Sequence, residues 1–120
     1  MNKIKGDGNM SQIEEQYLSK AMEMEGLIEY QNGTIVSKEL VKHTTGTITV
    51  FAVAEGQGIS EHAAPFDAVV QIIDGEALIT IGGENHTVRK GQMIIMPADI
   101  PHALKGSPKF KMMLTMIKYE

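Results

Sequence analysis

The stretch GISEHAAPFDAVVQIIDGEA, residues 58–77, joins one histidine, His62, to an apolar run and a turn dipeptide. Valine and isoleucine gather between residues 67 and 73, which favours an extended strand. Asp74-Gly75 follows, and Asp-Gly is typical of a tight hairpin turn. ALITI, residues 77–81, comes directly afterwards. The pattern therefore predicts two antiparallel strands joined at Asp74-Gly75.

Strand signals continue on both sides of this stretch. Asn32-Gly33 is typical of a turn, and strand-like runs cover residues 47–53, 86–90, 93–96 and 110–118. Glycine and proline separate these runs at short intervals, which indicates an antiparallel sandwich or barrel. We therefore predict an all-β fold.

The N-terminal part shows a different period. Ser11-Gln12-Ile13-Glu14 matches a capping box, and Ile13, Tyr17 and Ala21 recur at helical spacing. Gly26 is a plausible stop. We expect a short amphipathic helix near residues 11–24. In one domain, residues 1–26 would form a tail and this helix, and residues 27–120 the barrel.

The strand at 67–73 is apolar on both faces. Val70 and Ile72 point one way, whereas Val69 and Ile73 point the other. An antiparallel sheet commonly leaves one face polar and solvated, so the outer face here must also be covered. The leading helix or a second subunit would cover it, and we favour a homodimer.

Composition excludes several classes of protein. The net charge is -4, so the chain lacks the basic character of a nucleic-acid-binding protein. No apolar run approaches the ~18 residues of a membrane span, and the first residues lack the apolar segment of a secretory signal. Cysteine is absent, which excludes disulfides and thiolate chemistry. We expect a cytoplasmic protein.

Two glycine-framed segments resemble the paired motifs of the cupin superfamily. In the first, Gly56 is followed by five residues and His62, and Gly75 closes the motif. Ala64 stands at the second histidine position and Ala68 at the glutamate position.

The second cupin motif is similar to the segment that begins at Gly91. Pro97 and His102 match its proline and histidine, whereas Asp99 stands at its second glycine position and Gly106 at its terminal asparagine position. The resemblance implies a double-stranded β-helix, or jelly-roll cupin barrel, of the small RmlC-like conserved-barrel type, preceded here by the short N-terminal helix. Many single-domain cupins have no assigned activity, so the fold alone implies no function.

In metal-binding cupins, the resemblance implies three histidines and one glutamate that hold iron, manganese, nickel, zinc or copper. This chain keeps His62 and His102 and has alanine at the other two positions. Asp67 and Glu61 are the nearest carboxylates, but alternation along a strand turns them away from the ligand face. Asp99 lies in the loop before His102, within plausible reach of the barrel mouth.

Three interpretations of the two histidines remain open. They hold a divalent metal together with water or a nearby acid, they bind a ligand without metal, or they are satisfied core or rim groups. We favour the second, in which each imidazole donates or accepts a hydrogen bond to an anionic or carbonyl-bearing small molecule. The alternatives are a metal-dependent enzyme, an oxygenase or isomerase acting on a small acid or sugar, and a non-catalytic structural barrel.

Methionine supplies the candidate apolar walls of such a pocket. The chain has 9 Met, and this flexible side chain fills irregular space and adapts to ligands. His43 and His86 are expected at the solvated surface. The predicted wall residues come from the last strands: Met93, Met96, Met112, Leu114 and Met116.

Overall fold

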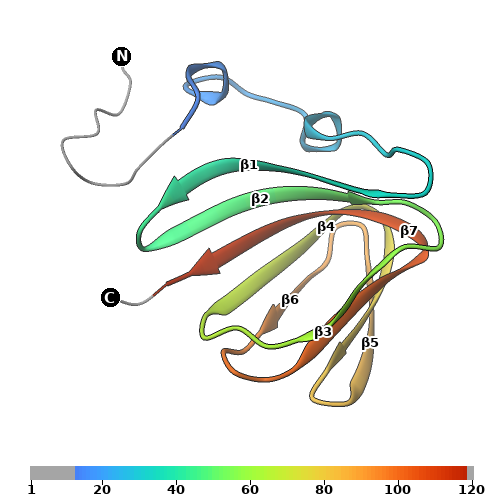
Figure 1. Ribbon diagram of the computed structural model, residues 1–120. Helices are drawn as coiled ribbons and strands as arrows, with labels where there is room; N and C mark the ends of the chain where they lie inside the picture. Colours follow the sequence, from blue (N-terminus) through green and yellow to red (C-terminus); the bar gives the residue numbers. More distant parts are fainter. Residues whose placement is uncertain (1–12, 119–120) are drawn as a thin grey trace.

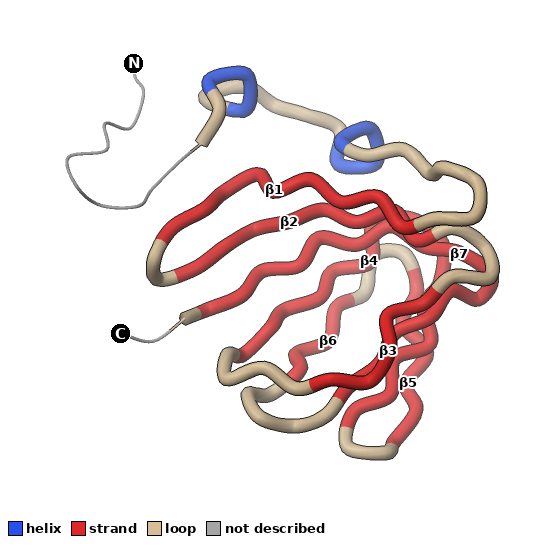
Figure 2. Tube along the Cα trace, viewed as in Figure 1, coloured by secondary structure: helices blue, strands red, loops and turns tan. Residues whose placement is uncertain are grey.

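The computed structural model describes residues 13–118, and within them seven strands form one antiparallel sheet that folds over on itself (Figure 1, Figure 2). The strands are β1 (Ile35–His43), β2 (Gly46–Val53), β3 (Gly58–His62), β4 (Asp67–Ile81), β5 (Glu84–Arg89), β6 (Met93–Met96) and β7 (His102–Ile117). The all-β jelly-roll barrel predicted from the sequence is confirmed.

Two long strands, β4 and β7, connect the halves of the barrel. They pair antiparallel from Asp67 opposite Ile117 to Ile81 opposite His102. The first part of β4 also pairs with β6, and its last part pairs with β5. Strand β7 pairs with β3 near its start and with β2 near its end. Each long strand therefore runs through both halves of the folded sheet, and His102 near the start of β7 and Met116 near its end line the same cavity.

The hairpin predicted at Asp74-Gly75 is wrong. Strand β4 passes through these residues without turning back, and its pairing with β7 shifts register on either side of Asp74 and Gly75. Gly75 has φ +75°, and a Cβ there would lie 2.2 Å from the carbonyl oxygen of Lys109. Glycine is needed at this irregularity, where β4 bends between the two halves. The dipeptide resembles a turn locally, but pairing with β7 keeps the strand extended.

The continuous N-terminal helix predicted over residues 11–24 is also wrong. The described part of that segment holds two 3₁₀ turns, η1 (Glu15–Tyr17) and η2 (Met24–Leu27); Ser11 and Gln12 lie outside the described residues. A helix of about 14 residues is marginal in water unless its apolar side packs well. Here Tyr17, Leu27 and Ile28 pack onto the sheet from an extended chain instead.

This N-terminal segment covers part of the outer face of the sheet, above β1 and β2 (Figure 1). Ile28 is 4% exposed and packs with Leu40, Val50 and Ala52. An irregular segment rather than a helix thus covers the outer face over β1 and β2, whereas the sequence prediction of a covered outer face concerned the strand at residues 67–73.

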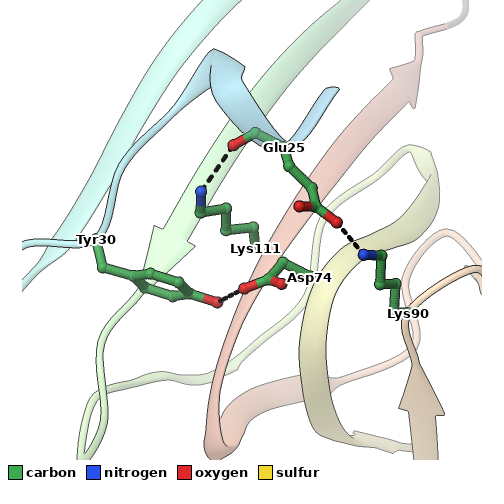
Figure 3. Close-up of polar contacts among 5 residues, drawn as sticks. All are labelled: Glu25, Tyr30, Asp74, Lys90 and Lys111. Atoms are coloured by element: carbon green, nitrogen blue, oxygen red, sulfur yellow. Dashed lines mark hydrogen bonds and ion pairs between the residues drawn. The ribbon is translucent and has the colours of Figure 1, made fainter. Parts of the chain in front are cut away.

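Polar contacts hold the same segment to the barrel, as Figure 3 shows. The buried ammonium of Lys111 donates to the carbonyl oxygen of Glu25 at 2.7 Å, while the Glu25 carboxylate pairs with Lys90. The Tyr30 hydroxyl donates to Asp74 at 2.6 Å. Burial, reinforced by the Asp74 carboxylate, raises the pKa of Tyr30 above its ordinary value. The neutral phenol is therefore part of this contact.

Strand alternation sets the two faces of the β4–β6–β7 region as predicted. Ala68, Val70 and Ile72 point into the main core, with Phe110 and Met112 of β7. The opposite face carries exposed apolar side chains that the N-terminal segment does not cover: Met93 and Ile95 of β6 and Ile117 of β7.

Candidate functional site

A cavity of about 330 Å³ occupies one end of the barrel core. Two imidazoles, His62 and His102, supply its polar groups, and its other lining side chains are apolar: Phe51, Ile59, Ala64, Ala68, Met96, Leu104, Met112, Leu114 and Met116. Clefts of roughly 300 Å³ and above that combine apolar walls with a few polar groups are typical of small-molecule sites. This cavity is therefore the candidate functional site.

A wider depression of about 450 Å³ lies outside the barrel, over β3, β5 and the parts of β4 and β7 beside them. Ser60, Thr80, Asn85 and Lys105 are among its lining residues, and Thr80 already donates to Asn85 at 2.8 Å. Neither histidine lines it. The barrel cavity is smaller, but it brings together the two residues that the sequence motifs single out.

The two histidines meet because β3 ends where β7 begins. His62 is the last residue of β3, His102 is the first of β7, and the two are partners in the register of these strands. Their ring centroids lie 4.5 Å apart with the planes at 70°, so the edge of one ring faces the other. His102 is 5% exposed, whereas His62 is exposed. The pair thus spans the cavity from its buried side to its rim.

Asp99 shapes the loop that leads into His102. It stands at the glycine position of the cupin motif and keeps the left-handed backbone, with φ +68°. Aspartate tolerates this conformation better than most residues with a side chain. Its N–H donates to the carbonyl oxygen of Ala64 at 2.7 Å, which ties the loop to the chain that follows β3. The residue serves the loop's geometry, and its exposed carboxylate does not line the cavity.

Each imidazole contacts a main-chain oxygen through Nδ1. His62 Nδ1 lies 2.9 Å from the carbonyl oxygen of Ser60, and His102 Nδ1 lies 3.1 Å from that of Ile100. A carbonyl oxygen only accepts hydrogen bonds, so Nδ1 carries the proton in both rings. In the neutral rings Nε2 is then an acceptor. From the sequence we expected that each ring could either donate or accept a hydrogen bond to the ligand. Because the Nδ1 protons are used in these two contacts, a neutral ring can offer a ligand only the acceptor Nε2.

His102 is held in its neutral form. Burial lowers the pKa of His102 below its ordinary value, and the adjacent His62 ring acts in the same direction, although the hydrogen bond to Ile100 opposes them. An unshifted histidine has a pKa of about 6.5. The His102 ring is therefore neutral at pH 7.

Most of the predicted wall residues reach the cavity. Met96, Met112, Leu114 and Met116 all line it. Met93 does not: it is 54% exposed on the outer face of β6, because alternation along this strand turns Met96 inward and Met93 outward. Including Met93 among the wall residues was an error of strand parity.

Sequence reasoning missed three wall residues, Phe51, Ile59 and Leu104. Ile59 and Leu104 are paired neighbours in β3 and β7, a short distance from the histidines. Leu104 lies two residues after His102, so alternation along β7 contained its signal. Ile59 lies three residues before His62, and the register shift between these two residues, which the sequence does not show, accompanies the presence of both in the lining. His43 and His86, which were expected at the solvated surface, are half-buried and do not line the cavity.

The residues present do not fit the four-ligand cupin metal site. Ala64 and Ala68 both line the cavity at the two missing ligand positions. Asp67, the nearest carboxylate in sequence, lies outside the lining and accepts from the Ala98 N–H at 2.9 Å. Within residues 13–118, no group of three or more His, Cys, Asp or Glu side chains is placed to hold a metal ion.

The family follows from the sequence and the fold together. A family model described as a cupin domain matches residues 49–117, which is more than half of the chain. The chain belongs to the cupin family. No curated protein matches it significantly.

Solved structures agree with this cupin assignment. A conserved protein of unknown function from Streptococcus pyogenes is 39% identical over 85% of this chain and 90% of its own, with a TM-score of 0.81. A cupin superfamily protein from Desulfitobacterium hafniense is 26% identical over 83% and 92%, with a TM-score of 0.80. A cupin 2 conserved barrel domain protein from Leptotrichia buccalis is also 39% identical; the match covers 76% of this chain and 44% of that one, with a TM-score of 0.73.

None of these three names assigns an activity, so function has to be argued from the cavity. Among the described residues, no helix is long and apolar enough to cross a membrane.

Proposed function

We propose that this cupin binds a small, largely apolar molecule inside the barrel, and that the two histidines contact the ligand directly in place of a metal centre. The observation that carries the proposal is the cavity of about 330 Å³, in which apolar side chains surround one pair of imidazoles. Its volume is close to the lower end of typical ligand sites. The ligand is accordingly small.

The alanines support direct contact. At Ala64 and Ala68 the ligand positions of the cupin site carry methyl groups, which bind no metal and enlarge the apolar part of the cavity. Three flexible methionines, Met96, Met112 and Met116, adapt to the shape of an occupant.

A fragment screen tests this proposal. Small apolar molecules with one polar group are screened by ligand-observed NMR against the wild type and against Ala68→Leu, which places three further carbons inside the cavity. We expect binding to the wild type and loss of binding in the variant. If no fragment binds the wild-type protein, the barrel is sealed by its own side chains, and the structural alternative replaces ours.

One observation favours a second candidate, a metal-dependent enzyme. Within residues 13–118, neither Nε2 has a hydrogen-bond partner, and an imidazole nitrogen with a free lone pair is a metal ligand. A catalytic zinc site usually has three protein ligands, and this cavity supplies two. An oxygenase or isomerase would therefore need water or its substrate to complete the coordination sphere. Retention of metal by the purified protein distinguishes this candidate from ours.

We also propose that a second copy of the chain covers the remaining outer face. Met93, Ile95 and Ile117 are each about half exposed there, and Val69 of β4 lies beside Ile95. Sedimentation velocity of the wild type and of Ile95→Lys measures the association. A dimer that dissociates in the variant supports this arrangement, and a monomeric wild type refutes it. A cytoplasmic location stays a prediction from the sequence.

A further inference from the structure

His102 presents a buried acceptor to the cavity. The residue is 5% exposed, its Nδ1 proton is used by the Ile100 carbonyl, and Nε2 has no hydrogen-bond partner within residues 13–118. A buried acceptor without a donor is unfavourable. His62 differs because it is exposed, so water can satisfy its Nε2. The buried ring is therefore the one that selects the ligand.

The acceptor defines the polar end of that ligand. Ring nitrogens without a proton repel the lone pairs of a carbonyl or ether oxygen and accept from a hydroxyl or N–H group. The Nδ1 protons of both histidines face main-chain carbonyl oxygens, and the other side chains that line the cavity are apolar and carry no polar hydrogen. A carboxylate would find no donor at Nε2 of the neutral His102 ring. A hydroxyl group complements His102 Nε2.

The walls define the rest of the ligand. Met96, Met112 and Met116 bring three thioethers to the cavity, and Phe51 adds an aromatic ring. Thioether sulfur and aromatic edges both interact favourably with an aromatic ring. An apolar cavity of about 150 Å³ is known to hold benzene. At about 330 Å³, this one has room for a substituted ring or a two-ring compound.

We propose that the cavity binds a small phenol, with the ring among the methionines and the hydroxyl donating to Nε2 of His102. This inference rests on the proposed function, because it requires the cavity to be a ligand site. It adds the chemical class of the ligand and the atom that recognises it.

Matched ligands test the proposal on the wild-type protein. Phenol, 4-methylphenol and 2-naphthol cover a range of sizes; each is compared by calorimetry with its methyl ether, which has no donor. The methyl-substituted hydrocarbons toluene, p-xylene and 2-methylnaphthalene control for size, and 4-methylbenzoate tests a carboxylate. We expect the best phenol to bind about tenfold more tightly than its ether, the ratio that one hydrogen bond typically supplies.

His102→Asn separates recognition from packing. An asparagine amide can reproduce the Nδ1–H contact to the Ile100 carbonyl, but it has no atom at the position of Nε2. We expect this variant to lose the tenfold preference for the phenol, while the affinity for the ether and the hydrocarbon stays the same. A second readout does not depend on the variant: phenol binding should shift the ¹⁵N resonance of His102 Nε2 and leave that of Nδ1 nearly unchanged.

The possible failures are distinguishable. If the ethers or hydrocarbons bind as tightly as the phenols, the cavity is a ligand site but the inference about His102 is wrong. Tighter binding of 4-methylbenzoate than of 4-methylphenol also overturns it. If none of these compounds binds, the inference is overturned, and the fragment screen decides separately whether the cavity is a ligand site.

Discussion

Filling the cavity should make the protein more stable and prevent ligand binding. Ala68 is 4% exposed, belongs to the main core cluster and lines the cavity. Its partners across the sheet are Met96 and Met116, whose flexible side chains can move aside. Ala68→Leu adds three carbons, and burial of each is worth about 0.8 kcal/mol. We expect a gain in unfolding free energy of roughly 2 kcal/mol, or a Tm increase of roughly 8 °C.

Ala77→Leu is the matched control. Ala77 lies on the same strand and in the same core cluster and is 0% exposed, but it does not line the cavity. Additional carbons in a filled core force strain, at a cost of about 1–3 kcal/mol. The two substitutions are chemically identical. If Ala68→Leu raises the unfolding free energy and Ala77→Leu lowers it, the difference is explained by the empty space beside Ala68.

Urea denaturation measures both stability changes, and calorimetry with 4-methylphenol measures binding. Ala68→Leu should be more stable than the wild type and should not bind, because the new side chain occupies the site. If Ala68→Leu is destabilised as much as Ala77→Leu, the cavity is not open space and the reasoning is refuted. A stabilised variant that still binds would place the ligand elsewhere.

Two further predictions concern the scaffold. Tyr30→Phe removes the hydrogen bond to Asp74 and should cost about 1–3 kcal/mol at neutral pH. Because the raised pKa keeps Tyr30 protonated in the fold while the unfolded chain ionises near pH ~10, the wild type should lose stability as the pH rises above ~10. Because Tyr30→Phe has no phenol to ionise, its unfolding free energy should fall less than that of the wild type above pH ~10. If the two proteins lose stability with pH in the same way, the Tyr30–Asp74 contact is contradicted. Gly75→Ala should cost about 3–5 kcal/mol, since it combines a clash at 2.2 Å with a positive φ. Gly33→Ala, at φ +71° with no atom within 4 Å, should cost only ~1 kcal/mol; equal losses in urea denaturation would show that the close approach at Gly75 is not the cause.

The fold could be predicted because its signals are local and repeated. Alternation along residues 67–73 separated the two faces of that strand without identifying the inward one, and the cupin motifs placed His62 and His102 on one site. The wrong predictions, a hairpin and a helix, came from the same kind of local pattern. They failed because contacts with distant parts of the chain decide the structure of these segments. Asp74-Gly75 resembles a hairpin turn until β7 pairs along all of β4. Residues 13–24 have helical spacing, but the sheet holds them in an irregular path.

The site was predicted in part for a related reason. Motif spacing identifies which residues are missing, here the ligands replaced by Ala64 and Ala68. The donor or acceptor role of each imidazole depends on the carbonyl groups of Ser60 and Ile100, which only the folded loop positions. Met93 shows the limit of composition: methionine is the correct residue type for the wall, but the parity of a four-residue strand decides where it points.

The central claim is that the two histidines meet a ligand directly because the metal site is incomplete. Its most direct test is the metal content of untagged protein, measured by elemental analysis after loading with zinc, nickel, manganese or iron and exhaustive desalting. The variant Ala64→His/Ala68→Glu, which restores both ligand positions in the cavity lining, is the positive control. We predict that the wild type retains far less than one metal ion per chain and that the variant retains close to one. A wild-type protein that holds one ion per chain, and loses it on His62→Ala, would contradict the account.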